Sequence, residues 1–136
     1  MDAQAGTGAS VYPGAATHPN LRQLDNRMQE CIGACSGCHN LCLDTVRHCL
    51  DLGGHHATRE QIGLLLDCAD ICRTSADFML RGSPRHALVC AVCADICQRC
   101  AEECERLAGD DEVLRLCADL CRRCAASCRE MVGTAL

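Results

Sequence analysis

Aromatic residues are almost missing from this sequence of 136 residues. It contains one tyrosine, one phenylalanine and no tryptophan. An ordinary core of this size contains several aromatic rings, because each ring buries a large apolar area. The sequence has 16 cysteines instead, so thiol groups must fill much of the interior. The length suits a single domain.

An export signal and a membrane-spanning segment are also missing from the pattern. Residues 1–20 show no positively charged start, no apolar run of roughly 7–15 residues and no twin-arginine pair. No stretch approaches the ~18 uninterrupted apolar residues of a membrane helix. Short chains with this much cysteine are usually secreted disulfide scaffolds. Without a signal we expect a cytoplasmic protein with no membrane partner, whose many reduced thiols indicate metal binding.

Positive charge is scarce as well. Thirteen Lys and Arg residues stand against 18 Asp and Glu, which gives a net charge of −5. A nucleic-acid partner requires a basic face, so none is expected. The sequence shows no pairing of a nucleophile with a base, so we do not expect an enzyme.

Capping and glycine signals divide the chain into four long helical segments. The first helix is expected to start at Asn20 with Gln23 and to end at Gly53–Gly54, and the second to start at Thr58 with Gln61 and to end at Gly82. The third is expected to start at Ser83–Pro84 and to end at Gly109, and the fourth to start at Asp110 or Asp111 and to end at Gly133. Short connections make consecutive helices antiparallel. The sequence therefore predicts an all-α fold, an antiparallel up-down-up-down four-helix bundle over residues 20–133, after a flexible N-terminal arm at 1–19.

The cysteines recur along each helix in steps of 3, 4 or 7 residues. By helix they are Cys31, Cys35, Cys38, Cys42 and Cys49; Cys68 and Cys72; Cys90, Cys93, Cys97, Cys100 and Cys104; and Cys117, Cys121, Cys124 and Cys128. At ~100° per residue each set forms a narrow stripe. Four such stripes predict a cysteine-lined core.

Cysteines four residues apart on a helix are close enough for two sulfurs to bind one ion. Soft thiolates select Cu(I), zinc or iron–sulfur clusters. Sixteen thiolates would fill only about four tetrahedral zinc sites and leave net negative charge in each, whereas about one Cu(I) per thiolate cancels the buried charge. We therefore predict many Cu(I) ions, about one per cysteine.

Other interpretations of the same cysteines remain open. Zinc or cadmium sequestration uses the same ligands, and a thiol redox or electron-transfer protein could use the Cys-x-x-Cys steps. Free cysteines also occur as small buried apolar residues. An iron–sulfur protein is disfavoured, because the ferredoxin spacing does not occur.

The two ends of the predicted bundle differ. Extending the stripes to one end adds Met28, Met79, His86 and Met131, whose thioethers and imidazole could admit Cu(I) and pass it inward. The opposite end is expected to be an apolar plug of Leu64, Leu65, Leu107, Val113, Leu114 and Leu116. His39 lies at the edge of the first stripe as a weaker ligand candidate. Thr45 and Ser75 are expected to be small fillers bonded to the preceding turn.

Paired cysteines on four helices, together with the His- and Met-bearing end, resemble the bacterial copper storage proteins over residues of about 20 to 133. Without an export signal the chain is similar to the cytosolic branch of that family. The resemblance implies a Cu(I)-filled bundle, often a homotetramer, that stores copper and protects against its toxicity. It also suggests delivery of Cu(I) by a copper chaperone.

Overall fold

The computed structural model describes residues 24–135, which form four long helices and one short helical turn. The elements are α3 (Asn26–Leu52), the 3-10 turn η2 (Gly54–His56), α4 (Arg59–Leu80), α5 (His86–Ala108) and α6 (Glu112–Ala135). No strand occurs among these residues. The arm expected at 1–19 and the residues of the capping box expected at Asn20 and Gln23 lie outside the described residues. The first helix was expected to open at Asn20, but α3 begins at Asn26, where the Asp25 side chain accepts a hydrogen bond from Met28 N–H at 2.8 Å and caps the helix.

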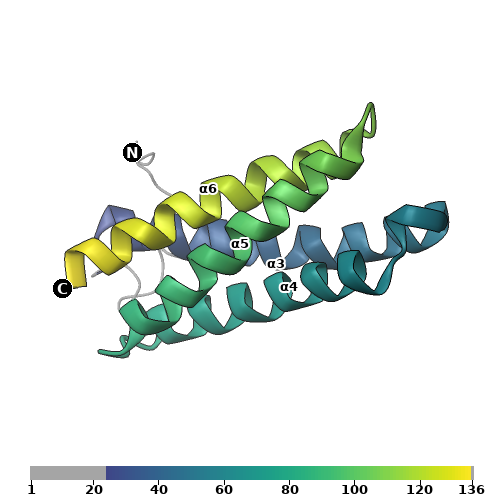
Figure 1. Ribbon diagram of the computed structural model, residues 1–136. Helices are drawn as coiled ribbons and strands as arrows, with labels where there is room; N and C mark the ends of the chain where they lie inside the picture. The colour runs from purple at the N-terminus through teal and green to yellow at the C-terminus, as the bar shows by residue number, and fades with distance from the viewer. Residues whose placement is uncertain (1–23, 136) are drawn as a thin grey trace, which may run out of the picture.

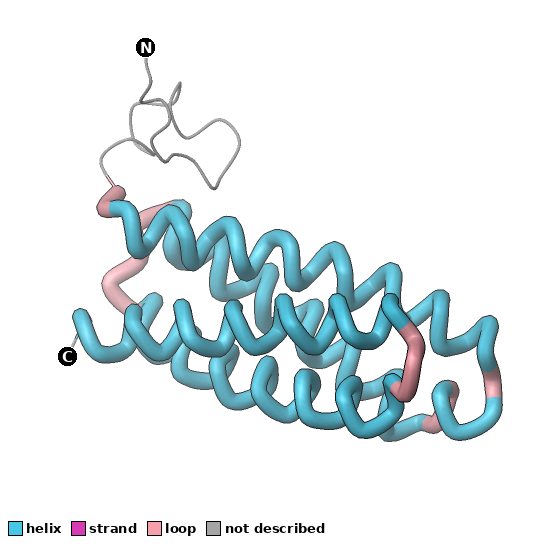
Figure 2. Tube along the Cα trace, turned by 90° about the horizontal axis from the view of Figure 1, so that it is seen from above, coloured by secondary structure: helices cyan, strands magenta, loops and turns pink. Residues whose placement is uncertain are grey.

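The four helices run alternately up and down along a common axis (Figure 1). Each packs on its two neighbours, α3 on α4, α4 on α5, α5 on α6 and α6 on α3. Short loops join the helix ends at both ends of the bundle (Figure 2). The predicted all-α up-down-up-down bundle is confirmed.

Two helix starts agree with the sequence, and two, those of α3 and α5, do not. The Thr58 hydroxyl accepts a hydrogen bond from the Gln61 backbone N–H at 3.1 Å, and Asp111 accepts one from Leu114 N–H at 2.9 Å, as N-caps do. The third helix was expected to open at Ser83–Pro84, but α5 begins at His86. Backbone bonds of the i to i+3 type, such as that from His86 N–H to the Ser83 carbonyl, wind a tight turn before the α-helix starts.

The helix ends follow the glycines in all but one case. Gly82 adopts a φ of 68°, and Ser83 N–H and Gly82 N–H bond to the carbonyls of Phe78 and Met79, which is the Schellman arrangement. Gly109, with a φ of 53°, ends α5. Gly133 was expected to end the last helix, but α6 continues to Ala135. Gly133 is not among the glycines with positive φ, so nothing in its backbone stops the helix.

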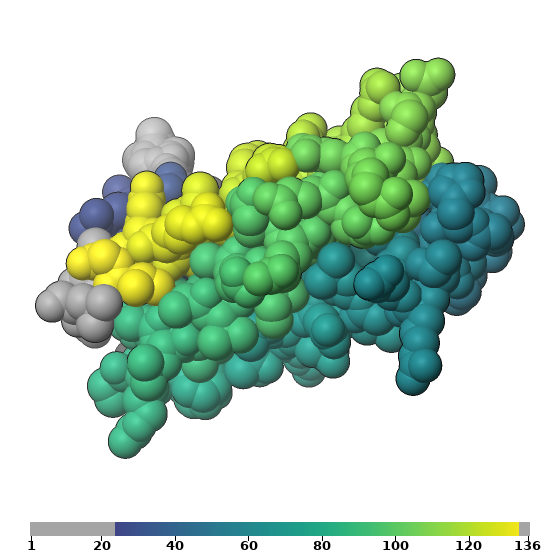
Figure 3. All heavy atoms as spheres, viewed as in Figure 1, coloured from purple at the N-terminus to yellow at the C-terminus, as the bar shows by residue number. Residues whose placement is uncertain are grey.

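Cysteine and alanine form most of the core. Every cysteine is at most 1% exposed, and alanines recur at seven-residue intervals beside the cysteine stripes, at positions 69 and 76, 94 and 101, and 118 and 125. Small side chains let the helices approach closely, so sulfurs from different helices can meet. On the face shown in Figure 3, α4, α5 and α6 close over this interior.

None of the described helices is long and apolar enough to cross a membrane.

Candidate metal centre

All sixteen cysteine sulfurs point into one interior, as the helical stripes predict. The cysteines are free and buried. Contacts between sulfurs join different helices: Cys38 on α3 lies 3.5 Å from Cys121 on α6, and Cys72 on α4 lies 3.5 Å from Cys97 on α5. Contacts along one helix are present too, with Cys38 and Cys42 3.9 Å apart. The result is a continuous column of sulfur along the bundle axis.

The column divides into groups of sulfurs that all lie within 4.8 Å of one another. These groups are Cys31, Cys90 and Cys128; Cys35, Cys93, Cys124 and Cys128; Cys38, Cys72, Cys97 and Cys124; Cys38, Cys42, Cys68 and Cys121; and Cys42, Cys100, Cys117 and Cys121. Successive groups share members, such as Cys124, Cys38 and Cys42. A sulfur that belongs to two groups can be a ligand in either, so the geometry suits a linked metal–thiolate array better than isolated sites.

The thiols of the column differ in acidity according to their neighbours. Hydrogen bonds from Cys124 and Cys31 hold the pKa of Cys128 well below its usual range, and those from Cys121 and Cys124 do the same for the pKa of Cys38. Burial raises the pKa of Cys49. A hydrogen bond with Cys128, with burial adding to it, raises the pKa of Cys90 to about 12. Some thiolates can therefore form inside the column while neighbouring thiols still donate to them.

At one end of the column a glutamine takes the place of sulfur. Gln61 is 1% exposed, and its side-chain nitrogen donates toward Cys49 Sγ at 3.9 Å and Cys104 Sγ at 3.7 Å. We expected Gln61 to complete a capping box with Thr58, but its side chain turns into the core. The signal was available, because Gln61 precedes Leu65, Cys68 and Cys72 in steps of 4, 3 and 4 along the α4 stripe.

The expected apolar plug at this end is therefore partly wrong. Leu65 and Leu114 are fully buried and Leu107 is 8% exposed, so these three close the end as predicted. Leu116 is 60% exposed and lies on the outer face of α6, one residue away from the seam position of Cys117. Gln61 adds a polar group that the prediction did not include.

The opposite end carries the methionines and His86, as the antiparallel order predicts. Met79 is 0% and Met131 2% exposed, and half-buried Met28 packs against the same core. His86 is half-buried, and its Nδ1 donates to the Ser83 carbonyl at 3.0 Å. Since a carbonyl can only accept, Nδ1 carries the proton, and Nε2 keeps its lone pair in the neutral ring.

Three other histidines of the described residues, His39, His48 and His56, make contacts outside the sulfur column. His39 Nδ1 donates to the Ala69 carbonyl of α4 at 2.7 Å. His48 Nε2 lies 2.7 Å from an Asp111 carboxylate oxygen, and His56 Nε2 lies 3.3 Å from the Leu107 carbonyl. Each of these bonds ties two elements of the bundle together, so a packing role accounts for them.

Thr45 and Ser75 lie in the cysteine stripes of α3 and α4, and both are fully buried. Thr45 donates to the Leu41 carbonyl at 2.7 Å, which confirms the expected bond to the preceding turn. Ser75 instead lies 3.2 Å from Cys90 Sγ. The α4 helix, which has only two cysteines, thus supplies a neutral polar side chain to an end sulfur at each end of its stripe.

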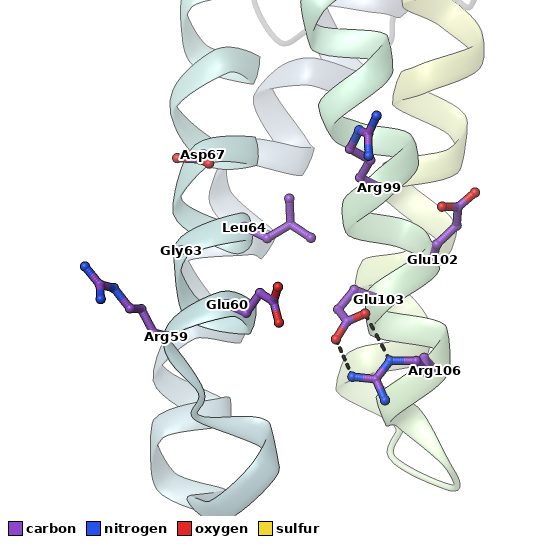
Figure 4. Close-up of a pocket in the computed structure, with 9 residues that line it drawn as sticks. All are labelled: Arg59, Glu60, Gly63, Leu64, Asp67, Arg99, Glu102, Glu103 and Arg106. Atoms are coloured by element: carbon purple, nitrogen blue, oxygen red, sulfur yellow. Dashed lines mark hydrogen bonds and ion pairs between the residues drawn. The ribbon is translucent and has the colours of Figure 1, made fainter.

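A surface groove of about 760 Å³ between α4 and α5 is separate from the column. Its lining consists mainly of charged residues of both signs, and Glu103 bonds to Arg106 within it (Figure 4). Cysteine, histidine and methionine are not among the lining residues, so the groove offers no soft ligands. Among the described residues, the cysteine ligands for a soft metal lie in the interior of the bundle and not in this groove.

Known proteins share both this sequence pattern and this architecture. A Bacillus subtilis (strain 168) protein described as the uncharacterized cysteine-rich protein YhjQ is 35% identical over 73 residues, covering 54% of this chain and 68% of that protein. The crystal structure of the Nitrosospira multiformis protein Nmul_A1745 superposes with a TM-score of 0.76 at 43% identity, covering 82% of this chain and 99% of the other.

Two similar solved structures are described as copper storage proteins. The Cu(I)-bound BsCsp3 superposes with a TM-score of 0.72 at 36% identity, over 78% of this chain and 98% of the other. Ccsp from Streptomyces lividans, loaded with 10 copper equivalents, superposes with a TM-score of 0.78 at 31% identity, over 91% and 98%.

The family model described as copper storage protein matches residues 24–133. That range holds all sixteen cysteines, the whole of α3, α4 and α5, and all but the last two residues of α6. The chain belongs to the copper storage protein family.

Proposed function

We propose that this protein stores and detoxifies Cu(I), holding about one ion per cysteine through its core thiolates. The observation that carries this proposal is the continuous column of sixteen buried, free sulfurs. A thiolate in such an interior is costly unless it is neutralised, and one Cu(I) per thiolate neutralises it fully. The relatives described as copper-loaded storage proteins support the same metal.

Zinc or cadmium sequestration is the second candidate, because the four-sulfur groups also suit a tetrahedral ion. Adjacent groups share Cys38, Cys42, Cys121 and Cys124. Two tetrahedral zinc sites cannot both claim one sulfur without bridging, so the column holds few independent zinc sites. Copper with two or three sulfur ligands uses the shared sulfurs more fully.

A thiol redox function is less well supported. Reactive cysteines normally lie in partly exposed, electropositive surroundings, whereas every cysteine here is at most 1% exposed. Their position in the middle of long helices gives a redox partner no direct access. We do not propose an enzymatic reaction.

The test is an anaerobic titration of the reduced apoprotein with Cu(I), with a parallel titration with zinc. We expect copper to saturate at roughly one ion per cysteine, and zinc at about four ions, from the charge argument. Competition with a strong Cu(I) chelator in the copper experiment, and with a strong zinc chelator in the zinc experiment, gives the two affinities for comparison. Copper saturation near four ions, or tighter retention of zinc, would contradict copper storage.

We also infer that the methionine end is where Cu(I) enters. Neutral thioether and imidazole ligands bind Cu(I) more weakly than thiolates do, so they can accept an ion and release it inward. Replacing Met28, Met79 and Met131 with leucine and His86 with alanine should slow loading severalfold and leave the final capacity nearly unchanged. Stopped-flow absorbance of the copper–thiolate band measures the rate. Equal loading rates would remove the entry role.

Cytosolic location, tetramer formation and delivery by a copper chaperone complete the proposal. The thiols must stay reduced to bind copper, and the cytosol keeps thiols reduced. Large apolar side chains off the seam, such as Leu88 at 69% and Val92 at 50% exposed on α5, are available for contacts between subunits. Light scattering of the purified protein tests the tetramer, and transfer of Cu(I) from a loaded chaperone tests the donor.

A further inference from the structure

Among residues 24–135, Gln61 is the one buried polar side chain that contacts two sulfurs of the column. It lies in the first turn of α4, after the N-cap Thr58. Its amide nitrogen donates toward Cys49 Sγ on α3 and Cys104 Sγ on α5, at 3.9 and 3.7 Å. One side chain therefore lies between the terminal thiols of two other helices.

These two thiols differ from the other fourteen. Every other cysteine belongs to at least one group of three or four sulfurs lying within 4.8 Å of one another, and Cys49 and Cys104 belong to none among the described residues. At this end Leu65 and Leu114, both fully buried, take the seam positions on α4 and α6. The sulfur column thus ends in a pair that is spaced by an amide.

The net charge of an ion bound at this end explains why an amide would lie beside the two thiols. Ions inside the column share sulfurs between groups and can reach neutrality. A single Cu(I) held by two terminal thiolates leaves one negative charge, with no further ion beyond it. A hydrogen bond donated to an anion is stronger than a neutral one, so the Gln61 amide offsets this charge where no additional copper can.

The oxygen of the same amide supplies an independent observation. Gln61 Oε1 is buried and has no hydrogen-bond partner. Leaving a buried acceptor unpaired is costly, and a leucine at this position would avoid the cost. A cation bound beside the two sulfurs would give the oxygen the favourable contact that it lacks.

We propose that Gln61 is the positioning residue of a terminal Cu(I) site formed by Cys49 and Cys104, next to the last four-sulfur group, with whose Cys100 and Cys117 Cys104 shares hydrogen bonds. This inference rests on the proposed storage of Cu(I). It assigns Gln61 to the binding of one ion at the leucine end and to no other ion in the bundle.

The experiment uses the full-length protein, loaded with Cu(I) and equilibrated with increasing concentrations of a Cu(I) chelator under anaerobic conditions. Metal analysis gives the ions retained per chain. The variants are Gln61→Leu, Gln61→Glu, Cys49→Ala with Cys104→Ala, and Gln61→Leu added to that cysteine pair. The matched control is Thr45→Val, because Thr45 is equally buried on the seam but bonds to a backbone carbonyl and not to sulfur.

In Gln61→Leu we expect about one ion to be lost at roughly tenfold lower chelator concentration than in the parent protein, which corresponds to about 1.4 kcal/mol. Gln61→Glu, which keeps the volume but replaces the donor nitrogen with oxygen, should lose the same ion. The cysteine-pair variant should lack that ion altogether, and adding Gln61→Leu to it should change nothing further. Thr45→Val should retain copper as the parent does.

A merely structural role for Gln61 gives a different pattern. Retention curves of Gln61→Leu that superimpose on those of the parent would overturn the proposal. So would a loss that adds to the loss in the cysteine-pair variant, because Gln61 would then act elsewhere. If the parent protein itself saturates near four ions, the storage function fails together with this site, whereas full loading with an unaffected Gln61→Leu variant refutes Gln61 alone.

Discussion

Cys121 has more sulfur neighbours than a terminal cysteine such as Cys90. Its sulfur lies 3.5 Å from Cys38 and 3.9 Å from both Cys42 and Cys68, and it belongs to two four-sulfur groups. Cys90 belongs to one group of three and has Ser75 as a close neighbour. The two cysteines are equally buried, so their difference is one of sulfur connectivity.

This difference predicts unequal effects of removing a sulfur. In the apoprotein, Cys121→Ala and Cys90→Ala should each cost about 1 kcal/mol of unfolding free energy, because each leaves a cavity of one sulfur atom. In the copper-loaded protein, Cys121→Ala should reduce the stabilisation by copper more, since the ions of two groups lose a ligand. Denaturant unfolding of both forms measures the four values. Equal losses in the loaded forms would show that ions do not share Cys121.

At the scale of the element, α4 differs from the other three helices. Its stripe holds two cysteines, with Gln61 and Leu65 before them and Ser75 and Met79 after them, all at most 1% exposed. The other helices carry four or five cysteines each. This helix closes both ends of the sulfur column while contributing little to its middle, so its placement depends on ordinary helix and packing forces.

The N-cap of α4 is therefore expected to matter for stability. Thr58→Ala removes the acceptor for the Gln61 backbone N–H and should lower the unfolding free energy of the apoprotein by about 1 kcal/mol. The matched control is Thr74→Ala in the same helix, where the side chain is exposed and alanine is the better helix former. Chemical denaturation of both variants is the measurement. An equal effect of the two changes would contradict a capping role.

At the scale of the whole molecule, the interior contains many thiol groups that are shielded from water, and the pKa of some of them is raised. Burial raises the pKa of Cys49, and the hydrogen bond with Cys128, aided by burial, raises the pKa of Cys90 to about 12. A thiol with a raised pKa prefers the folded state while it is protonated. Its contribution to stability is fully present below the unfolded pKa of about 8.5 and is lost as the pH rises through the folded value.

The part of the apoprotein's stability that Cys90 contributes should therefore be lost between about pH 8.5 and about pH 12, the interval between the unfolded and folded pKa values of this thiol. The copper-loaded protein should not lose it in the same way, because its sulfurs are already deprotonated and bound. Thermal unfolding midpoints of both forms at about pH 7.5 and about pH 10 test this, and the gap between the forms should widen with pH. A flat profile for the apoprotein would contradict the burial of neutral thiols.

The helical fold and the inward orientation of the cysteine side chains follow from the spacing of the cysteines in the sequence alone. Steps of 3 and 4 place side chains on one face of any regular helix, so the burial of Cys31 or Cys121 could be predicted without coordinates. The caps at Thr58 and Asp111 depend on interactions within four residues and were equally readable. The starts of α3 and α5 and the end of α6 were not predicted correctly. Capping residues and glycine, such as Ser83 and Gly133, each permit more than one local conformation.

The sequence by itself determined the four helices, their antiparallel order, the cysteine-lined seam and the family of the protein, since each depends on local spacing or on the motif as a whole. Only the tertiary structure decided which sulfurs meet across helices, that Gln61 lies between Cys49 and Cys104, and that Leu116 faces outward. Those outcomes depend on the rotation and axial shift of one helix against another. Packing of side chains distant in sequence sets both quantities, and no local pattern records them.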